Sequence, residues 1–165
     1  MIALLNDARF DFISRADKGF ISTFDEEMNK RGYSFGDKIG SGYCWGKYML
    51  IYRKSGIKSE KVFARIYIRD ISIVLRLFLN AIDKHRAFVE KAPAHIKEVF
   101  VGEEGNCQHC HNEKERMCRF RKTYTIDDRQ IEKCNGITFE FHNPSIERIP
   151  DYITLFTEFF PNKKK

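Results

Sequence analysis

The fold class of this chain is decided by residues 61–79, KVFARIYIRDISIVLRLFL. Two consecutive runs, 61–69 and 71–79, alternate with period two, and one face of each run is apolar. The opposite face carries arginines and rings, namely Arg65, Tyr67 and Arg69 in the first run and Arg76 and Phe78 in the second. Alternation over this length is typical of strands that bury one face. The stretch therefore predicts two strands of a half-buried antiparallel sheet.

The segments around this stretch complete an α+β pattern. Further strands are predicted at 47–53, 123–126, 130–133 and 137–142, with a turn at Asp127 and Asp128 between the second and third. Helices are predicted at about 6–31 with a split at Gly19, from Asp83 to Gly102 with a break at Pro93, and after Asn143-Pro144. The glycine-rich passage 32–46 is predicted to be irregular.

Consecutive strands with helices grouped outside them are typical of an α+β fold. We expect a single α+β domain over residues 1–165, because 165 residues match the usual size of one domain. The expected architecture is an antiparallel sheet of about five to six strands with helices packed on one face. The cysteine-rich segment 105–121 lies within that domain.

Charge and hydropathy indicate what class of protein this is, but they do not identify a binding partner. The chain holds 29 Lys and Arg against 23 Asp and Glu, a net charge of +6, and half of this excess is the tail Lys163–Lys165. No segment reaches the roughly 18 unbroken apolar residues of a membrane span, and no secretory signal is recognised. The sequence predicts a soluble, cytoplasmic protein with reduced cysteines and no membrane partner.

A cluster of cysteines is the clearest chemical signal in the chain. Four of its five cysteines, Cys107, Cys110, Cys118 and Cys134, fall within one short stretch. A Cys-x2-Cys turn directs two thiolates at one ion, and zinc prefers four sulfur or nitrogen ligands in a tetrahedron. We therefore predict a structural zinc held by these four cysteines.

Alternatives for the same cysteines remain open. His109 or His111 can replace one cysteine as a zinc ligand. Cys107 and Cys110 also have the spacing of a dithiol redox pair, with Asn106 placed to cap a helix that would lower the pKa of Cys107. In the third interpretation Cys118 and Cys134 are small buried apolar groups.

The mixed face of the two strands predicts a binding surface. Arginines interleaved with rings on a sheet suit an anionic small molecule or stacked bases, and Trp45 lies in the glycine-rich passage just before the sheet. We expect a small-molecule or anion pocket lined by Trp45, Arg65, Tyr67, Arg69, Arg76 and Phe78. Nucleic acid is the less favoured ligand, and long arginine side chains that merely cover the sheet are the alternative to any ligand.

Two parts of the chain resemble known groups of proteins. Residues 92–144, with EGNCQHC, CRFRKTYTID and KCNGITFEF, resemble small uncharacterised bacterial proteins in which a Cys-x2-Cys segment precedes a short hairpin and a further cysteine. The passage GYCWGKYMLIYRK and the strands after it are more remotely similar to YdhG-like domains, which are compact α+β folds. The resemblance implies an α+β fold and a bacterial cytosolic origin, and it carries over no catalytic residue.

No set of residues in the sequence has the pattern of a catalytic site. The five histidines are scattered, and none is cued to a Ser or Cys nucleophile. The sequence therefore favours a non-enzymatic binding module, with a thiol redox enzyme or sensor using Cys107 and Cys110 as the alternative.

Overall fold

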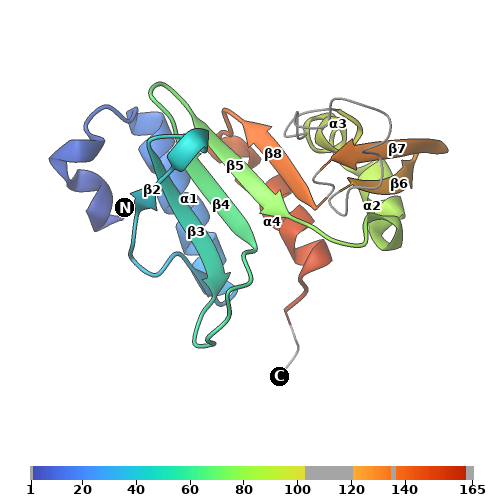
Figure 1. The fold of residues 1–165 in the computed structure, drawn as a ribbon, viewed down its shortest axis with the longest axis horizontal. Helices are drawn as coiled ribbons and strands as arrows, with labels where there is room; N and C mark the ends of the chain where they lie inside the picture. The colour runs from blue at the N-terminus through green and yellow to red at the C-terminus, as the bar shows by residue number, and fades with distance from the viewer. Residues whose placement is uncertain (1, 103–120, 135–136, 163–165) are drawn as a thin grey trace.

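An antiparallel sheet with helices on one face forms the body of the protein, which confirms the predicted α+β class (Figure 1). The computed structural model describes residues 2–102, 121–134 and 137–162. The long strands run in the order β3 (Tyr48–Lys54), β4 (Ala64–Ile68), β5 (Ile73–Phe78) and β8 (Thr138–His142). Two short strands, β1 (Tyr33–Ser34) and β2 (Gly40–Ser41), pair with β3 at the outer edge and complete six strands.

The helices α1 (Arg15–Lys30) and α4 (Ile149–Phe159) lie behind the sheet in Figure 1. The register places Leu50, Ile66, Leu75 and Phe141 in one row across the strands, and all four side chains are buried in the core cluster that includes the inner faces of both helices. Edge-to-face ring contacts join helix to sheet, as between Phe24 and Tyr52 at 5.6 Å. Among the described residues, no helix covers the opposite face of the sheet.

The first helix does not split at Gly19, so that prediction was wrong. The break comes earlier, because the hydroxyl of Ser14 accepts a hydrogen bond from the backbone N–H of Asp17 at 3.0 Å and starts α1 at Arg15. Short 3₁₀ turns at Ala3–Asn6 and Ala8–Phe10 precede it. A Cβ atom on Gly19 would lie 3.0 Å from Cδ1 of Ile146, so the glycine permits close packing against the turn η6 (Ile146–Arg148).

The strands predicted near 123–126 and 130–133 form but do not join the sheet. They make a separate hairpin of β6 (Arg121–Ile126) and β7 (Arg129–Cys134), turned by Asp127 and Asp128 at positive φ. The sheet has six strands because β1 and β2 join it, and both lie in the passage 32–46 that was predicted to be irregular.

Two helices connect this hairpin to the sheet beyond β8 (Figure 1). They are α2 (Arg86–Lys91), preceded by the turn η4 (Ile82–His85), and α3 (Ala94–Val101). The ammonium of Lys133, whose side chain is fully buried, donates to the carbonyl of Val99 at 3.0 Å. The hydroxyl of Tyr124 donates to the carbonyl of Phe100. Both bonds satisfy carbonyls at the end of α3 and fasten the hairpin to it.

Within the described residues, no helix has the length and apolar character needed to cross a membrane.

Candidate functional site

The six residues predicted to line a ligand site lie on the face of the sheet opposite α1 and α4, which we call the open face. Arg65 and Tyr67 project from β4, with Arg69 directly after that strand, and Arg76 and Phe78 project from β5. Arg65 pairs directly with Arg76 in the register, and the indole of Trp45 stacks on the Tyr67 ring with centroids 5.9 Å apart. We name this set, together with Arg53 and Glu140, the open-face cluster.

Trp45 reaches the open face because two glycines fold the turn η3 (Tyr43–Trp45) down onto the sheet. A Cβ atom at Gly46 would lie 2.8 Å from the backbone oxygen of Ile68, and one at Gly42 would lie 2.3 Å from the backbone oxygen of Gly46. Neither approach is possible with a side chain. Arg69 closes the arrangement, since its Nε donates to the carbonyl of Trp45 at 3.1 Å. The glycines of this passage therefore place an aromatic side chain.

A buried ion pair stands at the centre of the cluster. The guanidinium of Arg76 donates through Nε to Oε1 of Glu140 at 2.8 Å, and also through Nη2 to the same oxygen. Arg76 is 7% exposed and Glu140 5%. The guanidinium also lies 5.1 Å from the ring centroid of Tyr67 and 5.8 Å from that of Trp45. Arg76 is thus matched in charge and packed against two rings.

Arg65 and Arg53 lie in a different electrostatic position. Both are half-buried on the open face, and within the described part of the chain neither forms an ion pair. Arg65 packs over the ring of Phe78 at 5.3 Å. The covered Nε atoms of Arg53 and Arg65 and the covered hydroxyl of Tyr67 have no hydrogen-bond partner among the described residues. The open face therefore holds three hydrogen-bond donors for which the described residues provide no acceptor.

Sequence reasoning missed Arg53 and Glu140 as members of this face. Arg53 carries a local signal, because it continues the alternation of Met49 and Ile51 along β3. Glu140 stands between Phe139 and Phe141 in a predicted strand. This pattern indicates the face on which Glu140 lies, but it does not indicate that Arg76 is its partner. His142, two residues further along β8, lies with Nε2 3.2 Å from Oε2 of Glu140.

Of the four predicted zinc ligands, only Cys134 falls in the described part of the chain. It is partly exposed at the end of β7, opposite Arg121 in the register. Cys107, Cys110 and Cys118, with His109 and His111, lie outside the described residues. Among the residues that are described, no three His, Cys, Asp or Glu side chains come together as a metal site. Cys44 is exposed on η3, next to Trp45.

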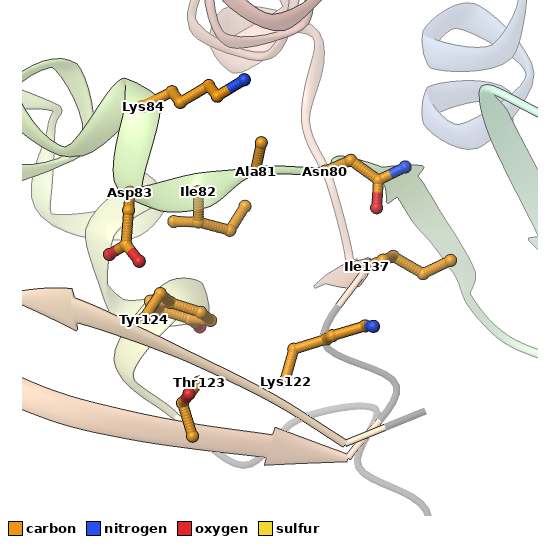
Figure 2. Close-up of a pocket in the computed structure, with 9 residues that line it drawn as sticks. All are labelled: Asn80, Ala81, Ile82, Asp83, Lys84, Lys122, Thr123, Tyr124 and Ile137. Atoms are coloured by element: carbon orange, nitrogen blue, oxygen red, sulfur yellow. The ribbon is translucent and has the colours of Figure 1, made fainter. Parts of the chain in front are cut away.

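A separate cavity of about 400 Å³ opens between the segment that follows β5 and the hairpin (Figure 2). Residues 80–84 form one wall and residues 122–124 of β6 form the other, with Ile137 at one end. No sequence signal brought these segments together, because some 40 residues separate them in the chain.

Comparison of the chain with family models, curated proteins and solved structures finds no match in any of the three.

Proposed function

We propose that the protein is a binding module whose open-face cluster holds an anionic small molecule rich in hydrogen-bond acceptors. The observation that carries this proposal is the set of three covered donors without acceptors, Arg53 Nε, Arg65 Nε and Tyr67 OH. Buried polar groups are nearly always paired, and an unpaired one costs about 1–3 kcal/mol. A ligand that offers acceptors to this face would remove that cost.

The charge pattern supports an anion as the ligand. Among the described residues, four arginines, Arg53, Arg65, Arg69 and Arg76, share the face with one glutamate, Glu140, which is already bound to Arg76. Arg65 stands directly opposite Arg76, and like charges in that position destabilise a sheet. An anion bound at Arg65 would relieve the repulsion. Arginine suits carboxylate and phosphate groups because its planar fork can bind two oxygens at once.

The first prediction uses Trp45, the single tryptophan of the chain, as a reporter of the site. Pyrophosphate and citrate are expected to change the emission of Trp45 and to raise the melting temperature, by about 2–4 °C for each kcal/mol of binding linkage. Arg65→Gln removes an unpaired guanidinium, so it should weaken binding about tenfold or more. The measurement is fluorescence titration with thermal melting at matched ionic strength.

The matched control is Arg15→Gln, which removes the same charge from an exposed position at the start of α1. This variant should bind both anions like the wild type. Equal binding by Arg65→Gln and the wild type would contradict the proposal. Tighter binding of a single-stranded oligonucleotide than of either small anion, with a steep salt dependence, would reassign the face to nucleic acid.

We also propose that the protein holds one structural zinc through Cys107, Cys110, Cys118 and Cys134. Support comes from the Cys-x2-Cys spacing and from the position of Cys134 at the end of β7. Cys134 pairs with Arg121 across the hairpin, and Arg121 follows Cys118 by only three residues in the chain. Four thiolates fit the tetrahedral coordination of structural zinc. When bound, the metal would supply folding energy rather than chemistry, because a closed site leaves no position for a substrate.

The second prediction tests this metal directly. Protein purified without chelator should contain one zinc per chain, and Cys110→Ser should release it and lower the melting temperature. Metal content by mass spectrometry and a thiol count on the same sample give the measurement. Cys44→Ser is the control, since Cys44 is an exposed cysteine of η3, and it should change neither quantity.

An unaltered melting curve for Cys110→Ser would contradict the zinc proposal. Absence of metal, with a thiol at Cys107 that alkylates rapidly near pH 6, would favour the redox alternative instead.

A further inference from the structure

The cavity between the segment that follows β5 and the hairpin combines an apolar body with a cation, Lys122, and an amide, Asn80, at one end. Ile82, Tyr124 and Ile137 line it, and Figure 2 shows Ile82 and Tyr124 extending into the space between the two walls. Its volume of about 400 Å³ falls in the range of ligand pockets, about 300–1,000 Å³. Such pockets form preferentially where two structural units meet, as the sheet and the hairpin do here.

The carboxylate of the cavity has a hydrogen-bond partner, whereas its lysines have no ion-pair partner among the described residues. Lys84 and Lys122 both line it, and neither ammonium forms an ion pair with any described residue. Asp83, the one carboxylate among the described residues of the lining, already accepts a hydrogen bond through Oδ1 from the backbone N–H of Thr125 at 2.9 Å. In Figure 2 it lies at one end of the cavity, with Lys122, Asn80 and Ile137 at the other. The second end therefore presents positive charge and an amide.

The walls of the cavity are held in place before any ligand arrives. The hydroxyl of Tyr124 is bound to the carbonyl of Phe100, and burial raises the pKa of this side chain well above its usual value. At the hairpin turn, Asp128 accepts from Arg86 at 2.7 Å and the N–H of Asp127 donates to Glu90 at 2.8 Å. A preformed pocket binds without first spending energy on ordering its walls.

The backbone on the sheet side of the cavity is strained. Ala81 adopts a left-handed conformation with φ of 55° and ψ of 51°, although it is not a glycine. A conformation of this kind costs about 1–3 kcal/mol and occurs preferentially at ligand sites. Here it turns the chain out of the sheet, so that Asn80 and Ile82 both line the cavity.

We propose that this cavity is a second ligand site, independent of the open-face cluster, that binds a small monocarboxylate with an apolar body. The carboxylate is held by Lys122, with the Asn80 amide at the same end of the cavity, and the apolar part packs against Ile82, Tyr124 and Ile137. A single negative charge is the match, because Asp83 opposes a second anionic group at the far end of the cavity.

Benzoate is the probe that tests this site, with benzamide as its neutral counterpart of the same shape. In two-dimensional amide NMR, benzoate should shift the resonances of residues 80–84 and 122–124 in a saturable manner, and benzamide should bind about tenfold more weakly or worse. Lys122→Gln should weaken benzoate binding about tenfold. Lys58→Gln, which removes a lysine from an exposed loop, should leave it unchanged.

The site is overturned if benzoate and benzamide shift these amides equally, if Lys122→Gln binds benzoate like Lys58→Gln, or if no saturable shift appears up to the solubility limit of benzoate. Independence from the open-face cluster is read in the same titration. Arg65→Gln should bind benzoate like the wild type. If Arg65→Gln loses as much benzoate affinity as Lys122→Gln, benzoate binds to the open face instead.

Discussion

Glu140→Leu is expected to lower the free energy of unfolding by about 3–5 kcal/mol, because it strands the buried guanidinium of Arg76 without a counter-charge. Arg76 and Glu140 are almost wholly excluded from solvent, and the rings of Tyr67 and Trp45 cover the guanidinium. Denaturation in urea measures the effect, as a lower midpoint with an unchanged slope.

The double variant Arg76→Met with Glu140→Leu separates the ion pair from the space it fills. Replacing both charges by apolar groups removes the desolvation cost together with the attraction, so the double variant should be close to the wild type in stability. Asp70→Asn is the control for an exposed pair. Its partner Lys47 lies 2.7 Å away with both side chains more than half exposed, and the expected loss is about 0–1 kcal/mol.

A loss below about 1 kcal/mol for Glu140→Leu would contradict the buried pair, since that value belongs to solvated ion pairs. It would also weaken the proposed function, which assigns ligand contact to Arg65 and Arg53 on the ground that Arg76 is already satisfied.

Phe139→Ala is expected to cost about 3–5 kcal/mol and to loosen the hairpin from the sheet. Phe139 is fully buried on β8, stacks on Phe100 of α3 with centroids 4.4 Å apart, and contacts Tyr124 of β6 at 6.3 Å. The ammonium of Lys133 in β7 lies 5.1 Å from the same ring. One side chain thus joins α3 and both strands of the hairpin to the sheet.

Hydrogen exchange is the measurement that resolves this loosening. Amides of β6 and β7 should exchange faster in Phe139→Ala by a larger factor than amides of β3 and β4, because the hairpin loses its contact while the sheet keeps its helices. Phe139→Leu is the control and should cost less than about 1.5 kcal/mol, since it largely refills the space. Equal acceleration in the hairpin and the sheet would show that they open as one unit.

Local patterns in the sequence predicted which side chains share a face. Alternation over residues 61–79 places Arg65 and Tyr67 on one side of a strand whatever the strand packs against, because successive side chains of a strand point to opposite faces. The same reasoning holds for Arg76 and Phe78. Turn and cap signals were equally local, and Pro93 separates α2 from α3 as predicted. Gly19 shows the limit of such signals, since its role is set by Ile146 in another part of the chain.

Pairing between distant segments was beyond local patterns. Glu140 meets Arg76 across 64 residues of chain, because β8 and not β6 or β7 adds to the edge of β5. Nothing in residues 121–134 marks them as a separate hairpin, since a strand has the same periodicity in either sheet. The alternation along β3 places Arg53 on one face of its strand, but only the pairing of β3 with β4 brings it to the same face of the sheet as Arg65.

The sequence by itself determined the α+β class, the boundaries of most elements and the mixed arginine and aromatic face of the central strands, because these follow from periods of two to four residues. Tertiary structure alone decided that Arg76 is neutralised by Glu140 while Arg65 forms no ion pair with any described residue, that Trp45 stacks on Tyr67, and that Lys122 lines one cavity with Asn80 and Ile137. The physical reason is that charge pairing and cavities arise between side chains brought together by strand order and helix docking, and those depend on the free energy of the whole core.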